Sequence, residues 1–139
     1  MIVTSGVIMA NQSERKFEMT VLYTSFDNDF NGLKAFFNAQ ANALPFKSLR
    51  GKTIEIRDVV ILEEDVVDTS SGEVESRKTV ILVDNSGQAY GTTSVTVSSQ
   101  VQRLIDVLGD VRSWPEAVRV KVSTAKSGKD REYTTLELV

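Results

Sequence analysis

The chain has 139 residues, 41% hydrophobic and 25% charged, which suits one packed domain and argues against wholesale disorder. It contains no cysteine and no histidine, which excludes disulfides, thiolate chemistry, zinc sites built from those residues and any histidine triad. No apolar run approaches the roughly 20 residues of a membrane span, and the start lacks a basic leading segment, so we expect neither membrane association nor a signal peptide.

The net charge of -3, taken alone, argues against a nucleic-acid-binding protein. The charges are unevenly distributed, however, because seven carboxylates and no base fall within residues 58–76. The rest of the chain carries all 16 bases against the other 12 acids. Local potential guides a polyanion more than the sum over the chain does, so the charge pattern leaves nucleic-acid binding open.

The first third of the chain predicts a strand over 16–23 and a helix over 26–40. The helix carries apolar residues three and four positions apart, which places them on one face and predicts their burial: Phe26, Phe30, Leu33 and Phe37. The segment ANALPF should end this helix, since Pro45 disfavours helical backbone in the residue before it.

From Gly51 onward the pattern favours strands rich in Ile, Val and Thr. The predicted order is a strand at about 52–63, an acidic loop 66–76, strands 77–84 and 88–97, a helix 98–109, a strand 117–125, a turn 126–130 and a strand 131–139. In the turn NSG, Gly87 can take a positive φ. Ser98 or Ser99 can cap the helix at its start, and Gly109 stands where a C-terminal cap is wanted.

This order is that of a five-stranded Greek-key barrel of the oligonucleotide-binding type, the OB-fold, in which a helix bridges strands three and four. Other small α+β folds share the same order. We therefore expect a mostly β fold forming a single domain over 1–139. Residues 51–139 would form the barrel, and residues 1–50 an N-terminal strand and helix extension.

Alternation along a strand predicts which side chains point away from the core. Tyr90 and Tyr133 are expected to point outward from the third and fifth strands, with Val95 and Val97 pointing inward. The run VVIL at 59–62 does not alternate, so it is expected to be buried on both sides or bulged.

An OB-fold binds single strands on the face around strands two and three, flanked by the first-second and fourth-fifth loops. Binding without sequence preference needs flat aromatic groups for the bases and cations for the backbone. The candidate contact residues are the aromatic and basic residues predicted on this face, on the outer strands and in the loops: Tyr90, Tyr133, Arg119, Lys121, Arg77, Lys78, Arg50, Lys52, Arg57, Phe46, Lys126, Lys129 and Arg131.

Each candidate also has a purely structural interpretation. Tyr90 could be a cross-strand packing partner, or the N-terminal helix could cover it. Trp114 is predicted to plug the bottom of the barrel, and Phe46 is ambiguous. The contiguous acids lack the EF-hand spacing, and GKT at 51–53 lacks the first glycine of a P-loop, so we expect no metal, no cofactor and no catalytic site.

Three segments carry a family resemblance: FNAQANALPFKSLRGKTIEI, VDNSGQAYGTTSVTVSSQVQRLIDVLG and SWPEAVRVKV. They resemble the single-stranded DNA-binding proteins of tailed bacteriophages, in particular of phages with protein-primed replication. The resemblance runs from about Phe26 to the C-terminus and consists of diffuse similarity and element order. It implies an OB-fold protein, not an enzyme, that coats and protects single-stranded DNA during phage replication in the host cytoplasm.

The resemblance also bears on partners. Single-stranded DNA is the implied ligand, with the replication DNA polymerase as a further candidate. Residues 1–25 lie outside the resemblance and could serve homo-oligomerisation. The chain ends in TTLELV, without the acidic tail of bacterial-type relatives, so recruitment by such a tail is not expected. The alternative function is a non-enzymatic phage structural or protein-interaction domain that uses the small barrel as a docking surface.

Overall fold

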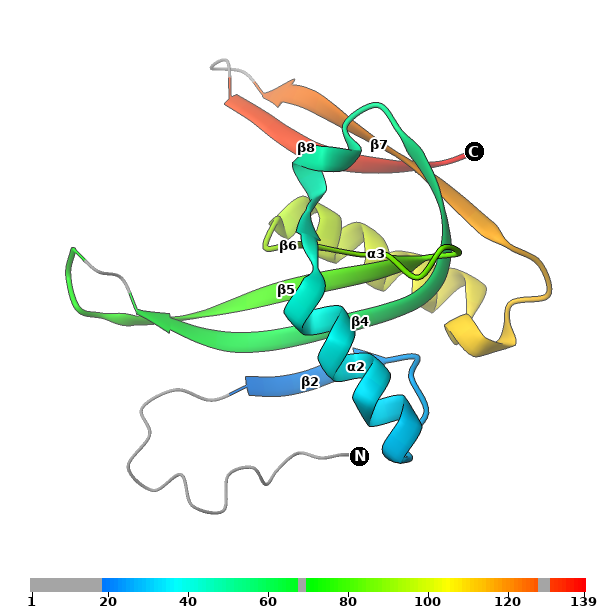
Figure 1. Ribbon diagram of the computed structural model, residues 1–139. Helices are drawn as coiled ribbons and strands as arrows, with labels where there is room; N and C mark the ends of the chain where they lie inside the picture. Colours follow the sequence, from blue (N-terminus) through cyan, green and yellow to red (C-terminus); the bar gives the residue numbers. More distant parts are fainter. Residues whose placement is uncertain (1–18, 68–69, 128–130) are drawn as a thin grey trace.

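The computed structural model describes residues 19–67, 70–127 and 131–139, and it leaves the side chains of residues 66, 67, 126, 127 and 131 undescribed. Its elements, labelled in Figure 1 where there is room, are β2 (Met19–Thr24), α2 (Phe30–Asn42), β3 (Leu44–Pro45), the 3-10 turn η1 (Phe46–Leu49), β4 (Thr53–Val67), β5 (Val74–Asp84), β6 (Ala89–Thr92), α3 (Val95–Leu108), the 3-10 turn η2 (Val111–Ser113), β7 (Val118–Ser127) and β8 (Arg131–Leu138).

The described strands form one mostly antiparallel sheet in the order β3-β6-β5-β4-β7-β8, with β2 joined to β4; among them, β3 and β6 run parallel. Figure 1 shows the sheet curled into a half-barrel, with α2 and α3 packed on it. The expectation of a mostly β fold is confirmed at this level. No helix among the described residues is long and apolar enough to cross a membrane.

The curl is organised by β4, which changes partner halfway along its length. Its first residues, Thr53–Ile56, pair with β7, and Val60–Glu64 pair with β2. A register shift separates the two halves, and the buried Asp58 there accepts a hydrogen bond from the Ser25 hydroxyl at 2.8 Å. This hydrogen bond offsets the cost of burying the Asp58 carboxylate at the bend.

Two hydrophobic cores lie on opposite faces of β4 and β5. Val59 and Ile61 belong to the main core inside the curl, while Val60 and Leu62 belong to a second core beneath α2. All four side chains are buried, which confirms the expectation that the run VVIL is covered on both sides.

Residues 44–52 bridge β6 and β7 across the mouth of the curled sheet. β3 pairs with β6, and the Gly51 amide donates to the Val122 carbonyl at 2.7 Å. Between these anchors Phe46 and Leu49 insert into the main core, each with 2% of its surface exposed. The structure resolves the ambiguity of Phe46 in favour of its structural interpretation, since its ring fills the core, and this burial argues against its candidate contact role.

On the other side of the opening, the Gln100 side chain of α3 forms hydrogen bonds with the backbone of β8. Gln100 donates to the Leu136 carbonyl at 3.1 Å and accepts from the Leu136 amide at 2.8 Å. The side chain thus occupies the hydrogen-bonding positions that a neighbouring strand would take along the edge of β8.

The third strand and the start of α3 differ from the sequence-based prediction. β6 ends at Thr92, and α3 begins at Val95 with Ser94 as its N-cap, whose hydroxyl accepts from the Val97 amide at 3.2 Å. The predicted strand over 88–97 and the cap at Ser98 or Ser99 are wrong. The capping hydroxyl of Ser94 outweighed the β propensity of the run VTV. Val95, which was predicted to point inward, is 80% exposed at the start of the helix.

The C-terminal end of α3 agrees with the prediction. Gly109 has φ 89° and its amide donates to the Ile105 carbonyl at 2.8 Å. Trp114 is half-buried against the main core, and its indole donates to the Gly109 carbonyl at 2.8 Å. The structural interpretation of Trp114 is thereby confirmed.

The acidic segment is mostly strand, and its prediction as a loop over 66–76 is wrong at both ends. β4 runs to Val67 and β5 begins at Val74. Glu63 lies opposite Lys78 and Glu64 opposite Arg77 on the paired strands. Opposite charges facing each other across two strands favour the extended hairpin over a solvated loop.

The predicted apolar face of α2 is largely exposed. Phe30 is 75% and Phe37 is 68% exposed, and Leu33 is exposed as well, so the expected burial is wrong for these three. The face that meets the sheet carries Phe36 and Ala39 instead, with Phe26 packed edge-on against Phe36 at a centroid distance of 6.4 Å. The helix is apolar on two faces, and only one of them has a sheet to cover.

A hydrogen-bond network ties β2 to the loop after α3. The Tyr23 hydroxyl donates to Asp110 and accepts from the Val111 amide at 3.0 Å. Burial, reinforced by the Asp110 hydrogen bond, raises the pKa of Tyr23 from 10.0 to about 12. The folded state therefore holds this proton more tightly than the unfolded state does.

This shift predicts a stability loss at high pH. The contribution of Tyr23 is fully present below pH 10 and is lost as the pH rises through about 12. We expect the free energy of unfolding, measured with denaturant, to fall more steeply above pH 10 for the wild type than for Tyr23→Phe. Tyr133→Phe, at an exposed site, is the control. Parallel pH profiles for wild type and Tyr23→Phe would contradict the assignment.

Candidate nucleic-acid interface

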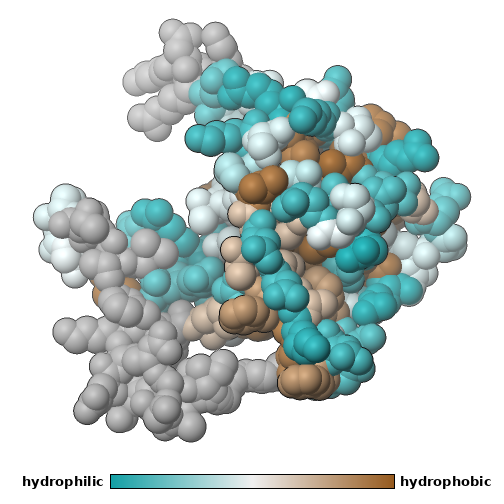
Figure 2. All heavy atoms as spheres, viewed as in Figure 1, coloured by the Kyte–Doolittle hydropathy of each residue, from teal (hydrophilic) through white to brown (hydrophobic). Residues whose placement is uncertain are grey.

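Two hairpins of the curled sheet, β4–β5 and β7–β8, extend to the same side of the molecule in Figure 1. The surface recedes between them in the space-filling view of Figure 2. We call this surface, with β6 and residues 44–52 at its base, the recess. Hairpins flanking a depressed strand face are the arrangement in which small barrels hold single strands.

Tyr90 lies at the base of the recess, on the concave face of β6. It is half-buried and packs against the main core, opposite Leu82 of β5 and Leu44 of β3. Its neighbours Ala89 and Gly91 face α2, where a Cβ added at Gly91 would lie 3.4 Å from that of Ala43. The prediction that Tyr90 points away from the core is therefore wrong, although part of its side chain remains accessible.

Tyr133 lies on the other face of the sheet. On β8 it stands opposite Ala125, three residues from Leu136, which packs against the main core. Alternation therefore places Tyr133 on the convex face, where it is 40% exposed. This agrees with the prediction that Tyr133 points away from the core. The structure does not bring the two candidate tyrosines together.

The basic segment 47–52 lies at the recess, and its three bases are exposed: Lys47, Arg50 and Lys52. Arg50 approaches Glu132 of β8, with 3.8 Å between guanidinium nitrogen and carboxylate oxygen. At that distance and exposure the ion pair is weak, so the guanidinium can contact another anion at little cost.

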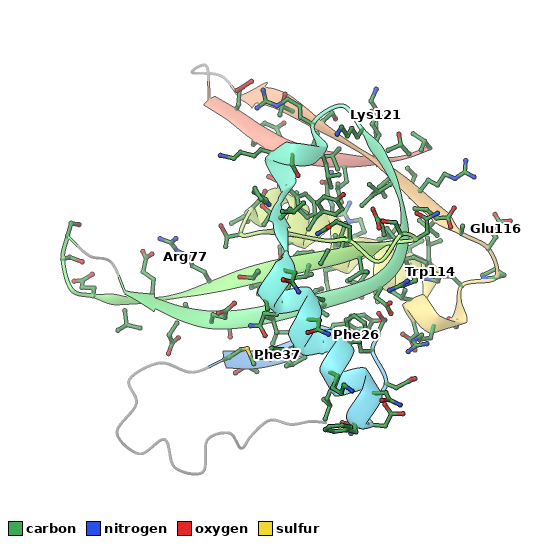
Figure 3. The ribbon with its side chains drawn as sticks, viewed as in Figure 1. Phe26, Phe37, Arg77, Trp114, Glu116 and Lys121 are labelled. Atoms are coloured by element: carbon green, nitrogen blue, oxygen red, sulfur yellow. The ribbon has the colours of Figure 1, made fainter. Side chains whose placement is uncertain are left out.

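The two bases of β5 are divided between the faces of the sheet. Lys78 shares the concave face with Val80 and is exposed. Arg77 points to the opposite face and forms an ion pair with Glu75 at 2.9 Å. Figure 3 labels Arg77 on the extended β4–β5 hairpin.

The other described candidate bases are Arg119 and Lys121 on the convex face of β7, and Arg57 on β4. Arg119 and Lys121 alternate with the inward valines of β7, as predicted, and Arg119 lies 3.8 Å from Glu55. Arg57 forms an ion pair with Asp58 at 3.3 Å. Three further candidates lie outside the described side chains and stay predictions: Lys126, Lys129 and Arg131.

One family model matches a stretch of the chain that includes all the described residues. The family model for the phage single-stranded DNA-binding protein, of the Phi29 type, matches residues 17–139. The chain belongs to this family. No curated protein and no solved structure matches it. The resemblance noted in the sequence is thereby confirmed, and it extends further toward the N-terminus than the segments that first indicated it.

Membership in the phage single-stranded DNA-binding family makes the exposed aromatics of α2 relevant, and sequence reasoning had assigned them to the core. Phe30 and Phe37 stand on the solvent face of α2, and Lys34 places its ammonium 5.3 Å from the centroid of the Phe30 ring. One signal in the sequence could have revealed them. The helix also offers Phe36, Ala39 and Ala43 at helical spacing, so it has more apolar faces than one sheet can cover.

A second depression, between α3 and β8, has different chemistry. It has a volume of about 640 Å³ and is lined mainly by aliphatic side chains such as Leu104, Val107 and Leu138. Arg103 is the basic residue in its lining. None of the described residues that line it is aromatic, so they offer no ring for stacking. Within the described residues, no three carboxylates converge on a metal site either.

Proposed function

We propose that this protein binds single-stranded DNA without sequence preference and does so in the recess. In this proposal it coats and protects displaced strands during phage DNA replication inside the host cell. The match of the phage single-stranded DNA-binding family over residues 17–139 carries the proposal. The proposal contains no catalytic step, because the family is described by binding alone.

The fold that supports this function is a five-stranded Greek-key barrel of the OB type. Counting from β4, the sheet order β6-β5-β4-β7-β8 places the fourth strand beside the first and the third beside the second. That neighbour pattern is the one a Greek key requires. Gln100 and residues 44–52 stand in for the pairing between β6 and β8 that would close the barrel.

Binding in the recess combines stacking with phosphate contacts. The accessible part of Tyr90 offers a flat surface to an unpaired base, and a duplex keeps its bases stacked away from such a surface. Lys78 lies on the same face of the sheet, and the exposed Lys47, Arg50 and Lys52 lie on the segment at the base of the recess, where they would contact the phosphates. A replication DNA polymerase and self-association through residues 1–25 belong to the proposal as further partners.

The two tyrosines give the sharpest test, because they lie on opposite faces. Tyr90→Leu keeps an apolar side chain against the core but removes the flat ring. We expect it to weaken oligo-dT binding by about 1–3 kcal/mol, the range of one stacking contact, in fluorescence anisotropy. Tyr133→Leu is the matched control and should change affinity by less than about 0.5 kcal/mol. A larger loss for Tyr133→Leu would move the interface to the convex face.

A further inference from the structure

The solvent face of α2 carries an aromatic stripe that the proposed function does not use. Phe30, Leu33 and Phe37 follow one another at helical spacing, and all are exposed. Figure 2 shows hydrophobic side chains on the surface over α2, and Figure 3 labels Phe37. The two rings stand seven residues apart, which is about 10 Å along a helix. A stripe of this kind usually marks a binding surface.

The chemistry around the stripe favours an anionic, aromatic ligand. Lys34 is the one charged residue of α2, and its ammonium lies over the face of Phe30 at 5.3 Å. The nearby carboxylates are engaged, since Asp27 pairs with Arg112 at 3.1 Å and Asp29 accepts from the Gly32 amide at 2.7 Å. Aromatic rings beside a cation suit bases joined by phosphates.

The stripe and the recess meet at the edge of the sheet formed by β3. At the C-terminal end of α2 the Gln88 side chain donates to the Asn42 carbonyl at 3.3 Å, which ties the helix to the strand that carries Tyr90. The next residue pair continues the path, because the exposed Leu44 pairs with Tyr90 itself. Because α2 packs on the face of β6 opposite Tyr90, a strand seated over Tyr90 would pass over Leu44 on the edge strand β3 to reach the solvent face of α2.

We propose that Phe30 and Phe37 form a second stretch of the single-strand path, with nucleobases stacked on both rings and a phosphate held by Lys34. This inference rests on the proposed function. A second copy of the chain is a poorer occupant, because α2 carries Lys34 and no carboxylate, so two stripes packed on each other would bring like charges together.

The test compares long and short oligonucleotides. Phe30→Leu/Phe37→Leu keeps the apolar surface and removes the flat rings, and Val107→Ala, at an exposed site on α3, is the control. We expect the double variant to lose about tenfold or more in affinity for an oligo-dT of about 30 nucleotides. An oligo-dT of about 8 nucleotides, which the recess alone can hold, should bind with unchanged affinity. Lys34→Gln should lower the salt slope by about 0.7.

The outcomes separate this inference from the function beneath it. If the wild type binds the long oligonucleotide and the double variant binds it equally well, the α2 path is wrong and the recess stands. If the wild type binds neither oligonucleotide, the proposed function fails and the α2 path fails with it. If DNA affinity is unchanged but light scattering shows altered self-association, the stripe is a contact between copies and the inference is overturned.

Discussion

Replacing Phe46 with alanine should destabilise the protein by about 3–5 kcal/mol, the cost typical of a phenylalanine removed from a packed core. Phe46 is 2% exposed and belongs to the main core together with Leu49, Val120 and Val122. It also holds residues 44–52 across the mouth of the curled sheet. Its loss therefore opens a cavity and loosens the bridge between β6 and β7. Urea unfolding monitored by circular dichroism measures the change.

Leu44→Ala is the matched control, since Leu44 lies two residues away in the same bridge but is exposed. It should cost under about 1 kcal/mol. Oligonucleotide affinity should be measured as well, because Phe46 was a candidate contact residue. A Phe46→Ala variant that keeps its full stability but loses oligonucleotide affinity would show that the ring contacts DNA instead of filling the core.

Neutralising the basic segment should produce the largest change in the salt dependence of binding. For Lys47→Gln/Arg50→Gln/Lys52→Gln we expect the slope of log affinity against log salt to fall by about 2, because each phosphate contact to a single strand contributes about 0.7. Affinity at low salt should fall tenfold or more. The fold should tolerate the change, since all three side chains are exposed and the Arg50–Glu132 pair is a weak surface contact.

A matched triple variant on the convex surface provides the control for position. Arg77→Gln/Arg119→Gln/Lys121→Gln removes the same number of charges, but from side chains that point away from the recess. Both triple variants change the net charge equally, so a general electrostatic effect would lower both slopes alike. A larger loss in the convex variant would contradict the proposed interface.

Several features could be predicted because short-range chemistry determines them. The valines of β7 alternate strictly, and the structure buries Val120 and Val122 while exposing Arg119. Gly109 ends α3 with a positive φ, which few other residues adopt cheaply. In each case the sequence signal and the tertiary structure agree, so local pattern was sufficient.

The orientation of Tyr90 could not be predicted, because it depended on where β6 ends. Alternation counted through Val95 and Val97 pointed Tyr90 outward, but those residues belong to α3. β6 has only four residues, and the close approach of α2 at Gly91 decides its faces. The small residues on either side of Tyr90 were the available signal: they allow a helix to come close, and the tyrosine then turns to the core.

The exposed face of α2 was missed for a related reason. Apolar residues at helical spacing predict burial only when a partner surface exists for them. The sheet offers α2 one face to pack on, and Phe36 and Ala39 occupy it. The stripe with Phe30 and Phe37 is left in solvent; the spacing shows that the helix has two apolar faces, but not which of them the sheet covers.

The most direct measurement is a titration with an oligo-dT of about 30 nucleotides and with a duplex of equal length, at two salt concentrations. Intrinsic tyrosine and tryptophan fluorescence provides the signal. The proposed interface predicts strong quenching by the single strand, little response to the duplex, and weaker binding at the higher salt. Equal affinity for the duplex, or no response to the single strand together with no gel shift, would contradict single-strand binding in the recess.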